Sequence, residues 1–230
     1  MTAPDSPSEI RRTIREAMLG HVPFDGWSWD AFKLAVEDTG VDPVLARDAF
    51  PNGPADVLAA TAAEADAAML SAMERHGGDG DPAERLAEAI RIRLEYNAGH
   101  EDAVRRGLAF LAMPGNTRSA WRLLMRTVDA VRTAAGDTAT GLRGMARRNA
   151  LASVYSATLL VWLEDASEGR EVTWDFLHRR LRPLTGAGSL ADRGLARASE
   201  LPRRLREAAP AALPLPGGPA PEADADPLDS

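Results

Sequence analysis

The chain contains no cysteine among its 230 residues. This absence excludes a disulfide framework, a thiol nucleophile and a cysteine-based zinc site. The four histidines are far apart in the sequence, and none has the short spacing that metal ligands show. A glycine-rich phosphate loop followed by Lys-Ser or Lys-Thr is also absent. We therefore expect a protein that is not an enzyme and that needs neither a metal nor a cofactor.

Positive charge is in short supply. The net charge is −7, and Lys33 is the only lysine. Proteins that bind nucleic acid without sequence preference need an excess of cations, so this balance argues against that class. We expect no nucleic acid among the partners.

Long apolar runs are missing as well. The most hydrophobic stretch, Ala150–Leu163, has 14 residues, whereas a membrane-spanning helix needs about 20. Residues Met1–Ser8 lack the basic-then-apolar order of a signal peptide. These features predict a cytoplasmic protein that is at most peripheral to a membrane.

Helix signals dominate what is present, and no alternating strand pattern appears. Ser6-Pro7-Ser8-Glu9 and Asp81-Pro82-Ala83-Glu84 both have the form of a helix start with a capping residue. Further helices are expected over about Asp56–Arg75, over Glu101–Met113 and across Ala150–Leu163, the last buried on several sides. The sequence predicts an all-α fold.

Residues 1–55 are laid out like a DNA-binding helix-turn-helix. A first helix is expected to break at His21–Gly26, a second to run from Ser28 to Thr39-Gly40, and a third to open at Asp42-Pro43. Between His21 and Phe50, however, only two side chains are basic and six are acidic. Such a surface does not displace counterions from phosphates. We predict a helix-turn-helix-like domain that does not bind DNA. The basic residues are Lys33 and Arg47, and the acidic ones are Asp25, Asp30, Glu37, Asp38, Asp42 and Asp48.

The C-terminal part divides in two. Residues 186–209 combine apolar residues at alternating steps of four and three with several arginines, which is typical either of a surface helix packed on the body or of a helix lying on a membrane. Residues 210–230 hold six prolines and four acidic residues and predict a disordered tail. The residues expected to contact a membrane are Leu190, Arg193, Arg197, Leu201, Arg203, Arg204 and Leu205.

The apolar stripes of residues 56–185 have two readings. They fill an ordinary core, or they enclose a cavity between helices, where ligands of helical bundles often bind. Helical phase places the following residues in a lining: Leu108, Leu111, Trp121, Leu124, Met125, Val128, Val154 and Thr158.

Several separate stretches resemble the ubiquinone-biosynthesis accessory family Coq-nine. The resemblance covers roughly Ile10 to Arg182 and rests on the order and spacing of the stretches. They are Val22-Pro23 with Gly26-Trp27, Leu111-Ala112-Met113-Pro114 with Asn116, Ala135-Gly136-Asp137-Thr138, Arg147-Arg148, Ala152-Ser153-Val154-Tyr155, Leu163-Glu164-Asp165, and Thr173-Trp174 with Phe176-Leu177.

The resemblance implies a fold similar to that of TetR-family regulators, in a family that has left DNA binding and binds lipids, including isoprenoid quinone intermediates. It implies that residues 56–185 bind lipid and dimerise, and that the protein presents demethoxyubiquinone to the di-iron hydroxylase of the pathway. It also implies a homodimer through the helices at Arg143–Asp165 and Glu171–Leu184, and membrane contact by the segment that follows. The implied dimer residues are Leu151, Tyr155, Leu159, Trp162, Trp174 and Leu177.

One departure from the family concerns the surface for the hydroxylase. The family has a Trp-Tyr pair where this chain has Gly144 and Met145. Two large aromatics are typical interface anchors, so either the partner has changed with them or docking is altered. The whole implied surface is Asp137, Arg143, Gly144, Met145, Arg147 and Arg148.

These observations together predict a lipid-binding accessory protein of ubiquinone synthesis, peripheral to the inner membrane of a bacterium. Two alternatives stay open. One is a TetR-like regulator that responds to a ligand, and the other is a structural subunit with a filled core.

Overall fold

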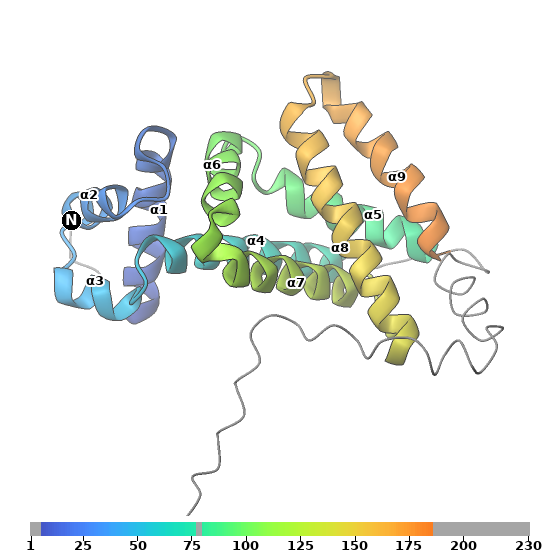
Figure 1. Ribbon diagram of the computed structural model, residues 1–230, viewed down its shortest axis with the longest axis horizontal. Coiled ribbons are helices and arrows are strands. Elements are labelled where there is room, and N and C mark those ends of the chain that lie inside the picture. The colour runs from blue at the N-terminus through green and yellow to red at the C-terminus, as the bar shows by residue number, and fades with distance from the viewer. Residues whose placement is uncertain (1–5, 77–79, 186–230) are drawn as a thin grey trace, which may run out of the picture.

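The computed structural model describes residues 6–76 and 80–185 (Figure 1). Within these ranges the chain forms α-helices and two single-turn 3₁₀ helices and contains no strand, so the all-α prediction is confirmed. The helices are α1 (Pro7–Asp25), α2 (Trp29–Thr39), α3 (Pro43–Ala49), α4 (Pro54–His76), α5 (Pro82–Glu95), α6 (Glu101–Ala112), α7 (Thr117–Ala134), α8 (Gly141–Glu164) and α9 (Glu171–Thr185), with η1 (Pro114–Asn116) and η2 (Glu168–Arg170) between them.

Side-chain caps set the starts of the first three helices, as the sequence indicates. Ser6 Oγ accepts a hydrogen bond from the Glu9 amide at 3.2 Å, and Ser28 Oγ accepts one from the Ala31 amide at 3.1 Å. Asp42 Oδ1 accepts from the Val44 amide at 2.7 Å. Each cap satisfies an amide that has no partner within its helix.

Two predicted details of the helix ends are wrong. The first helix does not break at His21, because it continues through Pro23 to Asp25 and ends at Gly26, whose φ is 68°. Pro23 removes one backbone hydrogen bond, but continuing the helix buries Met18 and Val22 completely. At the start of α5, Asp81 makes no side-chain capping bond.

Buried side chains form two clusters. The first joins α1, α2 and α3 to Val57 of α4 and Ala103 of α6. The second joins α4, from Met69 onward, to α5, α7, α8 and α9. Helix α4 contributes to both clusters. In Figure 1, α1–α3 lie at one end of the molecule and α8 and α9 at the other.

In the single chain, α8 is buried on one side only. Leu151, Tyr155 and Trp162 are buried, but Leu160 is 58% exposed and Ser153 is exposed as well. The expectation of a helix buried on several sides is therefore wrong for one chain. No helix of the described residues combines the length and apolarity needed to cross a bilayer.

Asp165 fixes the turn from α8 into α9. Its Oδ1 accepts from the amide of Ser167 at 2.9 Å and from the hydroxyl at 2.6 Å, and its Oδ2 accepts from the amide of Thr173 at 2.8 Å and from the hydroxyl at 2.6 Å. The Ser167 and Thr173 hydroxyls favour the charged carboxylate and hold the pKa of Asp165 well below its usual range. Asp165 thus acts as an anionic cap at the N-terminal end of α9.

This cap predicts a pH dependence. Because the native pKa of Asp165 is lowered, its stabilisation is complete above the unfolded pKa of about 3.9 and disappears as the pH falls below that value. Between pH 5 and pH 2, the wild type should therefore lose more stability than the Asp165→Asn variant. Urea unfolding followed by circular dichroism at each pH measures the difference, and parallel pH profiles would contradict the assignment.

Candidate functional site

A cavity of about 610 Å³ lies between the α1–α3 unit and the helices α4 to α8. Its volume is typical of sites that hold a small organic molecule. Its wall is mainly aliphatic, and the largest contributions come from α4, α6, α7 and α8. The aliphatic lining residues are Leu19, Leu58, Val104, Leu108, Leu111, Leu123, Leu124, Leu159 and Leu160.

The α1–α3 unit supplies one wall of this cavity. Arg15, Leu19 and Trp27 all line it. Trp27 is buried, and its Nε1 donates to the carbonyl of Ala103 on α6 at 3.0 Å. The helix-turn-helix-like unit is therefore joined to the helices that form the rest of the site.

One part of the wall is polar and buried. Arg93 Nε donates to Asp66 Oδ1 at 2.6 Å, and Thr127 Oγ1 donates to the same carboxylate oxygen at 3.0 Å. Arg93, Thr127 and the buried Tyr155 line the cavity, whereas Asp66 lies behind them. We call Asp66, Arg93, Thr127 and Tyr155 the polar wall.

The polar wall keeps two opposite charges out of water. Burial disfavours the cation, but the paired Asp66 carboxylate opposes this effect, and the pKa of Arg93 is raised. Burial also raises the pKa of Tyr155, so its phenol is neutral near pH 7. The wall thus contains one compensated ion pair and one neutral hydroxyl.

A second polar group lies where α1 meets α4. Arg15 forms an ion pair with Glu64 and lies 3.5 Å from Glu16. A neighbouring cleft of about 510 Å³ shares Glu16, Leu19, His100 and Ala103 with the cavity. The cavity therefore continues into a more polar cleft between α1 and the start of α6.

Three of the eight residues predicted for a lining border the cavity. Leu108, Leu111 and Leu124 line the cavity. Met125, Val128, Val154 and Thr158 are instead buried in the core, and Trp121 is 57% exposed.

The error has a geometric cause on α7. Ala120, Leu123, Leu124 and Thr127 face the cavity at helical spacing, and the neighbouring face with Met125 and Val128 faces the core. The predicted stripe combined these two faces. The sequence does carry the signal for the missed Leu123 and Thr127, because they lie three and seven residues after Ala120.

The implied dimer residues lie mostly inside one chain. Leu151, Tyr155, Trp162 and Leu177 are at most 6% exposed without any second copy, so the single chain already encloses them. Leu159 and Trp174 are half-buried. Tyr155 and Leu159 line the cavity instead.

The implied docking surface is largely structural. Asp137 accepts from Arg132 Nε at 3.0 Å and lies 3.5 Å from Arg147. Although burial opposes its charge, the Ala139 amide and Arg132 hold the pKa of Asp137 below its usual value. Arg148 makes two 2.6 Å hydrogen bonds to Asp129. These contacts fasten α8 to α7.

The three remaining residues of that surface differ in exposure. Gly144 is buried, whereas Met145 is 61% exposed, and Arg143 is exposed. The residues expected to contact a membrane, from Leu190 to Leu205, lie outside the described residues.

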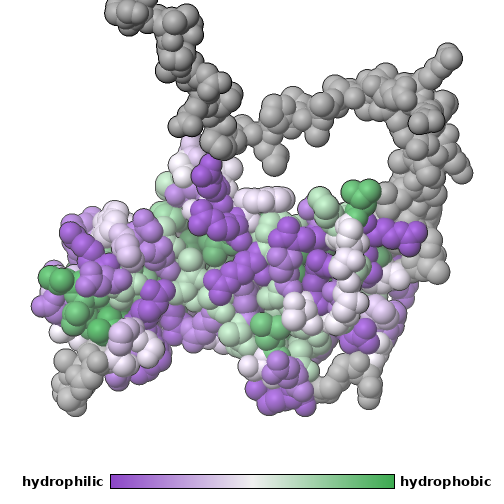
Figure 2. Space-filling view, turned by 90° about the horizontal axis from the view of Figure 1, so that it is seen from below, coloured by the Kyte–Doolittle hydropathy of each residue, from purple (hydrophilic) through white to green (hydrophobic). Residues whose placement is uncertain are grey.

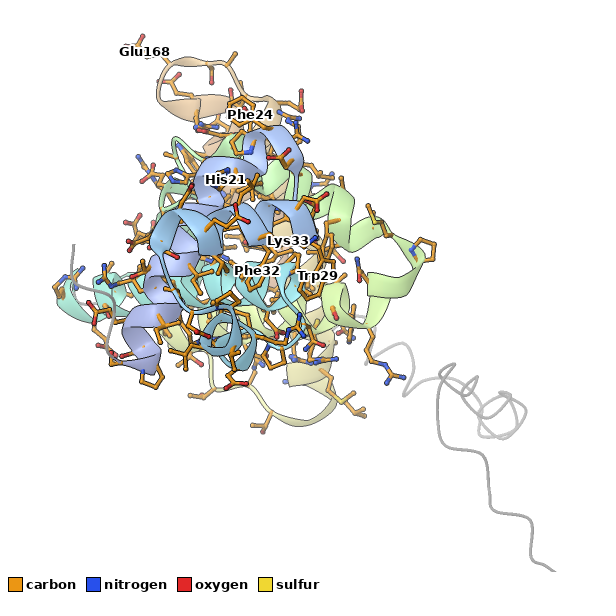
Figure 3. All side chains as sticks on the ribbon, turned by 90° about the vertical axis from the view of Figure 1, so that its left-hand side faces the viewer. His21, Phe24, Trp29, Phe32, Lys33 and Glu168 are labelled. Atoms are coloured by element: carbon orange, nitrogen blue, oxygen red, sulfur yellow. The ribbon has the colours of Figure 1, made fainter. Side chains whose placement is uncertain are left out.

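The helix-turn-helix surface offers few cations. On α3, Val44 and Leu45 are 67% and 48% exposed. Lys33 of α2 lies 3.4 Å from Asp30, and Figure 3 shows it beside Trp29 on the same helix. Figure 2 shows apolar side chains gathered at this end of the molecule. Such a surface is unlike one that binds phosphates.

Residues 6–76 and 80–185 contain no group of three His, Asp or Glu side chains arranged to hold a metal ion. The site within these residues is therefore an apolar cavity with a polar wall.

The family model of COQ9, the Coq-nine family, matches residues 117–187, which include α7, α8 and α9. We call this matched segment the COQ9 domain. This finding confirms the resemblance seen in the sequence. The domain provides the α7 and α8 walls of the cavity.

Relatives of the chain carry the same family name. "Ubiquinone biosynthesis protein COQ9, mitochondrial" of Drosophila melanogaster is 29% identical over 177 residues, which cover 75% of this chain and 54% of that protein. The human protein of this name is 26% identical over 195 residues, which cover 81% of this chain and 61% of that protein. The chain thus spans between half and two thirds of these relatives' length. They support a role in ubiquinone biosynthesis, and their names state no reaction.

The fold has a counterpart among solved structures. The crystal structure of the TetR transcriptional regulator from Nitrosomonas europaea superposes with a TM-score of 0.59 at 24% identity, covering 75% of this chain and 96% of that one. The predicted TetR-like fold is confirmed.

The predicted location is contradicted. The relatives from Drosophila melanogaster, Homo sapiens and Schizosaccharomyces pombe are all named as mitochondrial proteins of eukaryotes. This conflicts with an inner membrane of a bacterium. The expected location was based on composition and on residues Met1–Ser8, and neither identifies the compartment.

Proposed function

We propose that the COQ9 domain and the cavity together serve to bind an isoprenoid quinone intermediate and to present it to the demethoxyubiquinone hydroxylase. In this proposal the protein performs no chemistry of its own. The observation that carries the proposal is the cavity of about 610 Å³ whose wall is mainly aliphatic. The names of the relatives support the pathway.

The physical basis is the insolubility of an isoprenoid tail. Each 100 Å² of tail removed from water contributes about 2.5 kcal/mol to binding. A mobile carrier therefore needs an apolar enclosure, and the leucines of α6, α7 and α8 provide one. The fully filled core of a purely structural subunit would leave no such space.

Partners belong to the same proposal. Met145 is the large apolar side chain of the implied docking surface that points outward, so it is the contact we propose for the hydroxylase. A homodimer through α8 and α9 would use outward residues such as Leu160 and Val172, which are 58% and 56% exposed. Membrane contact is proposed for residues 186–209. Sedimentation equilibrium measures the homodimer, and liposome flotation measures membrane contact.

A ligand-responsive regulator is the rival function. It would share the fold and the cavity, but it needs a cationic reading helix. On α3, Arg47 is the one exposed cation, and it lies beside exposed Val44, Leu45 and Asp48, so the geometry favours the carrier.

The first experiment is a solvent extraction of protein purified without detergent, followed by mass spectrometry. The expected result is isoprenoid quinone at close to one molecule per chain. A lipid-free extract would point to a protein that acts through protein contacts alone.

A substitution inside the cavity tests the site directly. Leu108→Arg places a cation among aliphatic side chains and should weaken binding at least tenfold, because burying an unpaired charge costs several kcal/mol. Binding of a geranyl-substituted dimethoxybenzoquinone, followed by quenching of tryptophan fluorescence, measures the effect, since Trp27 lines the cavity. Hydroxylation of demethoxyubiquinone by the purified hydroxylase should fall with the same variant.

The matched control is Ala109→Arg, which introduces the same side chain at the next, exposed position of α6. It should bind the quinone and support hydroxylation as the wild type does. Equal binding by both variants would place the lipid outside this cavity.

A further inference from the structure

Tyr155 ends in a hydroxyl without a hydrogen-bond partner. The side chain comes from α8, lines the cavity and is 6% exposed. Among the described residues, no hydrogen bond involves its hydroxyl, although the hydroxyls of Thr127 and Thr158 are both bonded. Phenol groups in buried positions ordinarily find a partner. The hydroxyl of Tyr155 is therefore available to a group inside the cavity.

The surrounding charges determine what that group can be. Asp66 accepts hydrogen bonds from Arg93 and Thr127, so it has donors already. Arg93 is held by Asp66 at 2.6 Å and by the carbonyl of Ala62 at 3.4 Å. The polar wall as a whole carries no net charge. It therefore presents hydrogen-bond donors to the cavity without an excess of either charge.

From this arrangement we infer that the polar wall anchors an uncharged, oxygen-bearing ring, with the Tyr155 hydroxyl donating to a ring oxygen such as a quinone carbonyl. The apolar tail then runs along the leucines of α6 and α7. This inference rests on the proposed function and adds the orientation of the ligand and the group that selects its head.

Charged head groups fit this wall poorly. A phosphate or carboxylate head would have to compete with the Asp66 carboxylate for Arg93, and an ammonium head would lie close to the Arg93 cation. Either would have to disrupt a buried ion pair, which is expensive in a medium of low polarity. A neutral ring oxygen needs only the donor that is already in place.

The chain offers a matched pair of tyrosines for the test. It contains two, Tyr96 and Tyr155, and both line the cavity. Tyr96 is 43% exposed and thus meets solvent. Tyr155→Phe removes the buried hydroxyl alone, and Tyr96→Phe makes the same chemical change where water can replace the lost bond.

Two probes separate head from tail. One is the geranyl-substituted dimethoxybenzoquinone, and the other is geranylbenzene, which has the same tail and no oxygen. Dissociation constants of both are measured for the wild type and the two variants, and melting temperatures confirm that each variant is folded. Tyr155→Phe should weaken quinone binding about fivefold to tenfold, the value of one buried hydrogen bond, and leave geranylbenzene binding unchanged. Tyr96→Phe should change neither.

Each alternative result is decisive. Unchanged quinone binding by Tyr155→Phe, with both probes still bound, would overturn the anchor and leave the lipid carrier intact. An equal loss for both probes would show that Tyr155 acts through cavity shape and would also overturn the anchor. Failure of the wild type to bind either probe would overturn the carrier and the anchor together.

Discussion

Replacing either member of the buried ion pair alone should lower the free energy of unfolding by about 3–5 kcal/mol, and replacing both should restore most of that loss. The variants are Asp66→Leu, Arg93→Leu and the double substitution. Both side chains are at most 6% exposed and their atoms are 2.6 Å apart. Asp66→Leu leaves Arg93 buried without its carboxylate, and Arg93→Leu leaves Asp66 with the Thr127 hydroxyl and the mostly exposed Arg126, 4.0 Å away. The double change places two aliphatic side chains beside a core that already contains Met69 and Ile90.

Urea denaturation measures these free energies through a double-mutant cycle. An exposed ion pair supplies the control. Arg12 lies 3.5 Å from Glu16 with both side chains more than half exposed, so Arg12→Ala should cost less than about 0.5 kcal/mol. A double variant that is as unstable as the sum of the two single variants would show that the pair is not coupled.

The same glycine-to-alanine substitution should change the free energy of unfolding in opposite directions at two positions. Gly144→Ala should destabilise the protein by about 1–3 kcal/mol, and Gly20→Ala should stabilise it by up to about 1 kcal/mol. Both glycines lie within helices. A Cβ atom at Gly144 would be 2.3 Å from the carbonyl oxygen of Ala139, whereas a Cβ at Gly20 meets nothing within 4 Å.

The loop before α8 has little freedom to move away from the added atom. Arg132 donates to Asp137 at 3.0 Å and to the Ala139 carbonyl at 2.7 Å, so the loop is tied to the end of α7. Thermal unfolding of the two variants, measured side by side, gives the comparison. Stabilisation by both substitutions would mean that the loop gives way easily.

The same contact explains one departure from the family. A tryptophan at position 144 would need a different path for residues 137–140, because even a methyl group meets the backbone there. Gly144 and the path of the loop therefore belong together. The residue at position 144 thus affects the path of the loop backbone as well as the implied docking surface.

Local signals in the sequence account for most of the helices. Serine and aspartate caps placed the starts of α1, α2 and α3 correctly, because a cap depends on neighbouring residues only. The end of α1 was missed because it depends on the burial of Val22, which is a tertiary effect. Propensity suggested a break at Pro23, and packing overrode it.

The cavity was harder to predict for a similar reason. Helical phase identifies an apolar face, but it does not tell which of two adjacent faces meets a space and which meets another helix. On α7 that difference separates Leu123 from Met125, two residues apart. The sequence did not predict the polar wall, because Asp66, Arg93 and Thr127 lie on three different helices. In the sequence alone, each has the pattern of an ordinary surface residue.

The cavity wall formed by α1 and the turn that follows it gives the N-terminal unit a structural role. Arg15, Leu19 and Trp27 form one side of the space, and the Trp27 bond to Ala103 fastens that side to α6. The N-terminal unit thus forms one wall of the cavity and is joined to the helices that form the other walls. A fragment without α1–α3 would lack the wall formed by Arg15, Leu19 and Trp27. An apolar ligand in the remaining cavity would be exposed to water on that side. Under the proposed carrier function, the N-terminal unit helps to enclose the ligand, a role that requires no contact with DNA.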